Sequence, residues 1–288
     1  MGRLIINADD FGLTSGVNRA IVELHQAGVL TSATLMARGP AAEEAVEFAR
    51  STPSLGVGCH VVLVDGEPAL PPRDIPTLVD SSTGRLHSTL TEFLMRLFIG
   101  RIRPAEIEAE AAAQIALLQN RGLHLTHIDT HKHTHLFPGV MRPVLRAARA
   151  AGIAAVRNPF EPAWAVHATA GASWVRRSEV NLLRRLEPAL RRTIAKQGFL
   201  TTDGTIAVVG TGMLDVAAVR SLLTNLPPGT WELVTHPGYN DADLDKVRTR
   251  LRASREVERT ALKTVKQFPN LKLISYADLA PMKTNEFR

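Results

Sequence analysis

The chain has 288 residues, of which 45% are hydrophobic, and it carries a formal net charge of +6. This length and apolar content suffice for one large domain spanning residues 1–288. A single cysteine excludes an intramolecular disulfide, and the first residues lack the apolar core of a signal peptide, so we expect a cytoplasmic protein. Aromatic residues make up only 5%, without the arginine–aromatic alternation that stacks bases, so nucleic acid is not an expected partner.

The first half of the chain alternates between short apolar runs and amphipathic helical runs. Ser15 is a good N-cap for the first helix, and Gly28 ends it. Alternation of this kind is the βαβ rhythm of a parallel sheet. The predicted strands are residues 4–8, 29–36, 55–63 and 125–135, and the predicted helices are residues 15–28, 40–50, 104–120 and 138–150.

The same rhythm continues in the second half. It supplies enough βα units for a closed or nearly closed barrel, in which the loops after the strands build the active site. The predicted strands here are residues 154–157, 205–209, 231–236 and 271–275, and the predicted helices are residues 216–223 and 241–266.

Two segments interrupt the rhythm. Residues 64–100 open with a proline-rich stretch that is too long for a plain connection, and we interpret them as a lid or substrate loop. Residues 160–200 contain a basic helical segment at about 174–196, with arginines recurring every seven residues. Its basic face is either a solvated surface or a dock for an anionic partner or a membrane.

Histidines cluster in residues 124–135, which hold five of the ten in the chain. If this stretch is a strand, residues two apart share a face. An all-polar face is unsuited to a dry core, and it predicts a strand that opens into a cation site. A solvated histidine-rich edge is the alternative. The face consists of His127, Asp129, His131, His133 and His135.

Titratable groups follow the ends of four predicted strands: the pair Asp9 and Asp10, then His60, His131 and His236. Two histidines and a carboxylate can hold one divalent cation with a coordination position left open. We assign Asp10 to the metal and Asp9 to the general base, with the reverse left open, and His236 to the general acid. The turn allowed by Gly12 is expected to bring both aspartates to the rim. Capping roles for the aspartates and for His236 are the alternatives.

Further polar residues near these strand ends are expected to support the site or to contact substrate. Asp129 precedes His131 by two residues on the same predicted face, which makes it a candidate partner for a metal-binding histidine. The complete set is Asp129, His127, His133, His135 and Arg157.

Motifs spread over most of the chain resemble those of the YdjC-like carbohydrate deacetylases, a family that includes chitooligosaccharide deacetylases and the deacetylase associated with hopanoid biosynthesis. The matching stretches are Asn-Ala-Asp-Asp-Phe-Gly-Leu at 7–13, Leu-Thr-Ser-Ala-Thr at 30–34, Gly-Cys-His at 58–60, the histidine run at 127–135 and His-Pro at 236–237. The first motif together with the histidine run is a specific signature.

The resemblance implies a distorted (β/α) barrel of the polysaccharide-deacetylase type, with a metal held by Asp10, His60 and His131 and with Asp9 as base. It also implies removal of the N-acetyl group from an amino sugar. Lys132 stands where the family often has histidine, and we expect it to face away from the site. By ligand type the metal is Zn, Mn or Co, whereas the family is usually described with Mg, so Mg and Zn both stay open.

The predicted function is therefore a metal-dependent hydrolase that releases acetate from an N-acetylated sugar, either a chitooligosaccharide or an N-acetylglucosaminyl conjugate. Two alternatives are another metal-dependent amidohydrolase or phosphoesterase on a similar barrel, and a sugar-binding module without turnover. The basic helix slightly favours a lipid-linked substrate or a peripheral membrane contact. A homodimer stays open.

Overall fold

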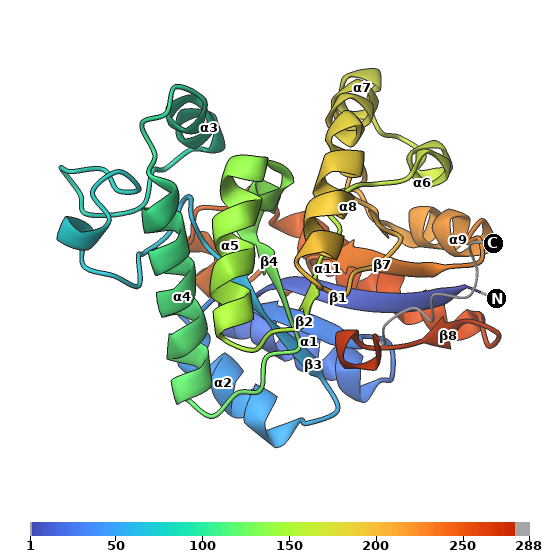
Figure 1. Ribbon diagram of the computed structural model, residues 1–288. Helices are drawn as coiled ribbons and strands as arrows, with labels where there is room; N and C mark the ends of the chain where they lie inside the picture. The colour runs from blue at the N-terminus through green and yellow to red at the C-terminus, as the bar shows by residue number, and fades with distance from the viewer. Residues whose placement is uncertain (1, 280–288) are drawn as a thin grey trace.

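The computed structural model describes residues 2–279, and its centre is a single sheet in which all of the paired strands are parallel. The strand order is β5-β4-β3-β2-β1-β7-β6, and β8 pairs with β1 (Figure 1). The strands are β1 (Arg3–Phe11), β2 (Ser32–Leu35), β3 (Gly56–Val61), β4 (His127–Thr130), β5 (Ala155–Val156), β6 (Gly204–Ile206), β7 (Thr230–Thr235) and β8 (Lys272–Leu273).

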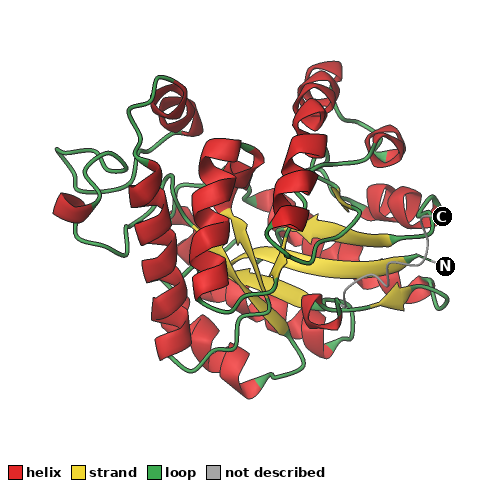
Figure 2. Ribbon diagram, in the orientation of Figure 1, coloured by secondary structure: helices red, strands yellow, loops and turns green. Residues whose placement is uncertain are grey.

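Helices surround this curved sheet (Figure 2). The first begins at Ser15, but its N-cap is Thr14 and not Ser15 as predicted. The Thr14 side chain accepts a hydrogen bond from the Val17 N–H, and the helix buries Val17, Ile21 and Leu24 against the sheet. The helices that follow strands are α1 (Ser15–Gln26), α2 (Ala42–Ser51), α4 (Pro104–Asn120), α5 (Pro138–Ala150), α9 (Val216–Thr224) and α11 (Ala253–Leu262). The interrupting segments contribute α3 (Leu90–Phe98), α6 (Ala163–Ala168), α7 (Trp174–Leu183) and α8 (Glu187–Lys196).

The two ends of the sheet meet through irregular backbone contacts. Ala155 in β5 forms a parallel bridge with Leu200, four residues before β6. The Thr205 N–H in β6 donates to the Phe160 carbonyl at 3.0 Å. The predicted α/β fold, a distorted barrel of parallel strands, is confirmed.

Three predicted elements differ from the structure. The strand predicted over 125–135 ends at Thr130, because Lys132 and His133 adopt left-handed backbone angles (φ 56° and 50°) and residues His131–Leu136 form a 3-10 turn. The strand predicted over 205–209 ends at Ile206, since Ala207 has φ 72°. The helix predicted over 241–266 is broken into α10 (Ala242–Asp245), a loop, α11 and a 3-10 turn. Across residues 2–279, no helix combines the length and apolar content needed to cross a bilayer.

Candidate active site

A cavity of about 1430 Å³ opens where the strands of the sheet end. Its floor contains every strand-end group that the sequence placed there: Asp9, Asp10, His60, His131 and His236. Its walls come from the two interrupting segments and from the loop between α10 and α11, through Asp65, residues 88–91, Arg176, Glu179 and residues 248–254. Segments far apart in the chain therefore build one site.

A bulge in β1 brings two adjacent aspartates into the floor. The register between β1 and β2 shifts between Ala8 and Phe11, and Asp10 adopts φ 64°. An extra residue in a strand changes the alternation of its side chains, so Asp9 and Asp10 can reach the same cavity instead of opposite faces. The bulge brings them together, and not the turn at Gly12 as we expected from the sequence.

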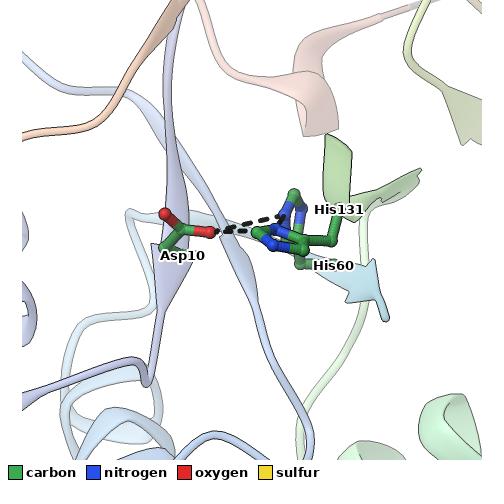
Figure 3. A group of neighbouring side chains, drawn as sticks. All are labelled: Asp10, His60 and His131. Carbon is green, nitrogen blue, oxygen red and sulfur yellow. Dashed lines mark hydrogen bonds and ion pairs between the residues drawn. The ribbon is translucent and has the colours of Figure 1, made fainter. Parts of the chain in front are cut away.

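Asp10, His60 and His131 converge on one point (Figure 3). Asp10 Oδ1 lies 3.6 Å from His60 Nε2 and 3.3 Å from His131 Nδ1, and the two ring nitrogens are 3.3 Å apart. Two ligands on one tetrahedral zinc ion would stand about 3.4 Å apart. Asp10 Oδ1 is buried without a hydrogen-bond donor in the described chain. Such an orphaned oxygen beside two imidazoles fits a cation site.

The second oxygen of Asp10 is held by a residue that we did not predict. Arg255 on α11 donates from Nη2 to Asp10 Oδ2 at 2.6 Å, and its side chain is buried. Burial alone raises the pKa of Asp10, but Arg255 and His131 hold it well below its usual range. Nothing in the sequence distinguished Arg255 from the solvated arginines of neighbouring helices.

Asp129 orients His60. The His60 Nδ1–H donates to Asp129 Oδ1 at 2.7 Å, and the Thr34 hydroxyl donates to Asp129 Oδ2 at 3.2 Å. The ring is thereby fixed with Nε2 toward Asp10 and His131. Burial lowers the pKa of His60, but the carboxylates of Asp129, Asp9 and Asp10 raise it to about 9.

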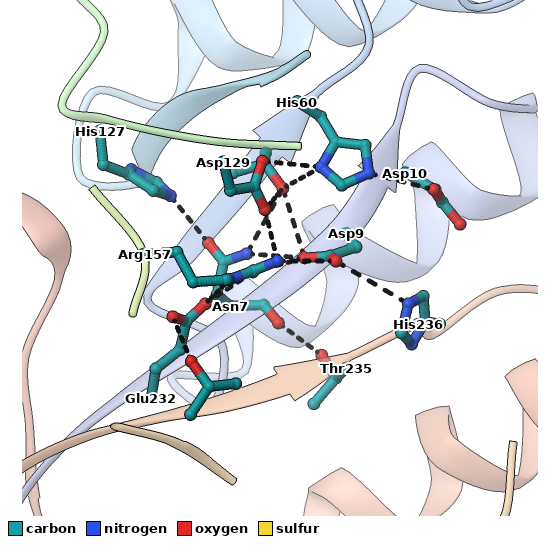
Figure 4. A network of polar contacts seen from close by, with 12 residues as sticks. Asn7, Asp9, Asp10, His60, His127, Asp129, Arg157, Glu232, Thr235 and His236 are labelled. Carbon is teal, nitrogen blue, oxygen red and sulfur yellow. Dashed lines mark hydrogen bonds and ion pairs between the residues drawn. The ribbon is translucent and has the colours of Figure 1, made fainter. Parts of the chain in front are cut away.

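Below the triad, Arg157 lies at the centre of a buried polar cluster (Figure 4). It binds both oxygens of Asp9, at 2.9 and 2.6 Å, and donates to Glu232 Oε1 at 2.8 and 2.6 Å. It also pairs with Asp129. Burial raises the pKa of Asp9, but Arg157 and His60 hold it well below its usual range. Arg157 is fully buried, so of our two expectations for it, support and substrate contact, the structure favours support.

His236 faces Asp9 from the end of β7. Its Nε2 is 3.8 Å from Asp9 Oδ2, and its Nδ1 is 4.0 Å from Oε2 of the buried Glu258. The His236 backbone N–H donates to the same Glu258 oxygen at 2.6 Å. Glu258 was not predicted, and neither was Glu232, although an acid at the centre of the apolar strand 230–235 is a signal that could have identified Glu232.

The remaining histidines of the cluster occupy different environments. His127 is fully buried, stacks on Tyr276 with ring centroids 3.8 Å apart, and shares a 3.2 Å hydrogen bond between its Nε2 and Asn7 Oδ1. Burial and Arg157 hold its pKa well below the usual value, so it is neutral. His135 is also fully buried, against Thr130, so neither residue contacts the cavity.

Besides His131, two residues of the turn after β4 line the cavity: Lys132 and His133. Lys132 Nζ pairs with Asp65 Oδ2 at 2.8 Å. Our expectation that Lys132 faces away from the site is wrong, because the strand ends before it. Its left-handed backbone redirects the side chain toward the mouth.

The fold and the site together define a parallel α/β barrel with a carboxylate–imidazole triad and a second carboxylate–histidine pair at its strand ends. The sequence profile of the YdjC-like protein family matches residues 3–268. The chain belongs to this family.

Individual relatives agree with that assignment. A carbohydrate deacetylase from Thermoanaerobacter pseudethanolicus is 31% identical over 284 residues, covering 97% of this chain and 100% of that one. A carbohydrate deacetylase from Brevibacillus brevis is 44% identical, but the match spans about half of each protein, 51% of this chain and 55% of the relative.

Solved structures share the fold. A putative cellobiose-phosphate cleavage protein from Enterococcus faecalis superposes with a TM-score of 0.73 at 27% identity, covering 95% of this chain and 97% of that one. A lactam utilization protein from Thermus thermophilus superposes with a TM-score of 0.52 at 16% identity, covering 95% of this chain and 99% of that one, which shows likeness of fold alone.

Proposed function

We propose that this protein is a metal-dependent carbohydrate deacetylase that hydrolyses the N-acetyl group of an amino sugar and releases acetate. The observation that carries the proposal is the convergence of a metal-type triad, a second carboxylate and a separate histidine on one cavity. One relative that matches nearly the whole chain and another that matches half of it are both named carbohydrate deacetylases, which supports a sugar as the substrate.

Asp10, His60 and His131 would hold one divalent cation. Bound there, the cation supplies a Lewis acid for the acetyl carbonyl and lowers the pKa of water. Two imidazoles and one carboxylate are ligand types that favour zinc, while magnesium prefers oxygen ligands, so we propose zinc ahead of magnesium. Arg255 keeps Asp10 Oδ2 engaged, which leaves Oδ1 as the ligand atom.

Asp9 is the proposed general base. Asp10 Oδ1 lies against both His60 and His131, whereas both oxygens of Asp9 are held by Arg157. Because Arg157 keeps this carboxylate ionised, Asp9 is ready to accept a proton from the attacking water at neutral pH, although its intrinsic basicity is weak.

His236 is the proposed general acid. Its Nε2 faces the cavity beside Asp9, and Glu258 lies behind its Nδ1. When the amide C–N bond breaks, the departing sugar nitrogen needs a proton, which His236 Nε2–H can donate. The products are acetate and the free amino sugar, so the atoms balance with water as the only co-reactant.

The test compares His131→Ala with His167→Ala, which removes an exposed histidine outside the cavity. We expect wild type and His167→Ala to bind one zinc ion per chain and to release acetate from an N-acetylated disaccharide, and His131→Ala to do neither. Acetate release by His131→Ala at the wild-type rate would refute the assignment. Phosphate release from sugar phosphates, measured in parallel without acetate release, would support a phosphoesterase instead.

A further inference from the structure

Exposed apolar side chains gather on two helices of the interrupting segments. Within residues 2–279, nine large hydrophobic side chains are exposed, and six of them lie on α7 or on and just after α3. Exposed apolar residues on a protein surface are normally scattered singly, so their concentration on two helices indicates an interaction surface. They are Met95 (57% exposed), Phe98 (69%), Ile99 (58%), Trp174 (78%), Val175 (44%) and Leu182 (60%).

Both helices border the candidate active site. Leu90 and Thr91, in the first turn of α3, line the cavity, and so do Arg176 and Glu179 on α7. Figure 1 shows α3 and α7 projecting beyond the rest of the molecule at the same end, on either side of α5. A flat surface that contacted the tips of both helices would therefore lie across the mouth of the cavity.

The segment that contains α7 and α8 is rich in positive charge. Residues 174–196 contain seven arginines and lysines and only two glutamates. Arg185, Arg192 and Lys196 make no ion pair with the described part of the chain. Arg101, exposed just after α3, is likewise unpaired there.

We propose that α3 and α7 dock on an anionic membrane surface with the mouth of the cavity facing the lipid headgroups. Exposed tryptophan, phenylalanine and methionine beside basic residues suit the interface between headgroups and acyl chains. The basic residues would be attracted to anionic lipids within a Debye length, about 10 Å at 0.1 M salt. A second copy of this chain would present the same positive charge and be repelled.

This orientation deepens the proposed function, on which the following step rests. If the enzyme deacetylates an amino sugar at a membrane, the acetylated sugar is carried by a lipid whose chain stays in the bilayer. The sugar then needs to rise only from the headgroup layer into the cavity between α3 and α7. A soluble acetylated disaccharide would use the same catalytic groups without this docking.

The chain offers an internal probe for the test. Of its three tryptophans, Trp164 and Trp231 pack edge to face with centroids 5.3 Å apart, while Trp174 is 78% exposed. With vesicles containing 30% phosphatidylglycerol in phosphatidylcholine, we expect a blue shift of the fluorescence and quenching by brominated acyl chains. Pure phosphatidylcholine vesicles, or 0.5 M salt, should weaken binding at least tenfold.

Variants identify the surface by vesicle sedimentation. Phe98→Ser with Trp174→Ser, and separately Arg185→Glu with Arg192→Glu, should each lower the affinity for the anionic vesicles at least tenfold. Val257→Ser and Arg50→Glu are matched controls, since these residues are exposed outside the two helices, and they should bind like wild type. Acetate release from a soluble disaccharide should be unchanged in all four variants.

Three results would overturn the proposal: no binding to anionic vesicles, equal binding to neutral ones, or a dimer in solution that the Phe98→Ser/Trp174→Ser variant converts to a monomer. The last would assign the surface to a second copy of the chain. Failure of the proposed function is distinguishable, because wild type would then bind vesicles and yet release no acetate from any substrate.

Discussion

The floor and the mouth of the cavity hold their charges in different ways. The floor, taken together with the buried cluster beneath it, is shielded from solvent: the side chain of Asp9 is 4% exposed, and those of Arg157, Asp129 and Glu232 are 0% exposed. At the mouth, Lys132 and Asp65 form a pair with side chains 31% and 16% exposed, and Arg248 is 64% exposed at 3.7 Å from Asp65.

This difference sets how much each region tolerates change. A buried charge that loses its partner stays in a low-dielectric interior, which is strongly unfavourable, whereas an exposed charge is solvated and screened. The floor can therefore hold one arrangement of catalytic groups rigidly. The mouth can vary in sequence, and with it the choice of substrate or surface, at little cost to the fold.

The largest expected effect is at the centre of the floor. Arg157→Met leaves Asp9, Asp129 and Glu232 without their shared cation, and breaking such a pair typically costs about 3–5 kcal/mol. Urea unfolding should show a loss of this size, and acetate release should disappear. Arg146→Ala, which removes an exposed pair with Glu108, should change stability by under about 1 kcal/mol. Equal losses in the two variants would contradict the comparison.

Metal binding should stabilise the floor by a smaller amount. At a free zinc concentration 100 times the dissociation constant, a single site on the folded state adds about 2.7 kcal/mol to the free energy of unfolding. We expect this gain for wild type after removal and readdition of zinc. Asp10→Asn should gain almost nothing, and Asp65→Asn, at the mouth, should gain as much as wild type. Stabilisation of Asp10→Asn by zinc would place the ion elsewhere.

The affinity for metal should depend on pH through His60. A ring must lose its Nε2 proton before that nitrogen can bind a cation, and in the metal-free protein the pKa of His60 is raised to about 9. The affinity should therefore rise about tenfold per pH unit up to pH 9 and then level off, because below the pKa each pH unit raises the deprotonated fraction of His60 about tenfold. Calorimetry in buffers of different ionisation enthalpy would count the released proton. A metal affinity that did not change between pH 6 and pH 8 would refute this linkage.

The sequence predicted the barrel because each strand is encoded locally. Leu4, Ile5 and Ile6 form an apolar run, and a strand in a parallel sheet is buried on both faces whatever its position in the sheet. The residues of β3 and β7 are buried in the same way. The strand-end groups were predictable for the same reason, since the carboxyl ends of parallel strands share one edge.

The parts that could not be predicted depend on tertiary contacts. Asp10 has a left-handed backbone because it lies in a bulge of β1, where the register with β2 shifts. Lys132 has one because it lies in the turn that ends β4 early. Neither residue type demands such angles. Arg255 and Glu258 lie on a helix whose spacing equally suits a solvated face, so only the packing of α11 against the strand ends shows their role.

The smallest expected effect lies at the mouth, where Lys132→Met tests the comparison from the other side. The substitution removes the 2.8 Å ion pair between Lys132 and Asp65. The Asp65 carboxylate still has Arg248 at 3.7 Å and is still partly solvated. We expect the free energy of unfolding to change by less than about 1 kcal/mol. The kcat for acetate release should stay within about twofold of wild type while KM rises about threefold, because Lys132 touches the cavity wall and none of the reacting groups. If kcat instead fell as far as we expect for Arg157→Met, Lys132 and its partner Asp65 would have to be counted with the floor and not with the mouth.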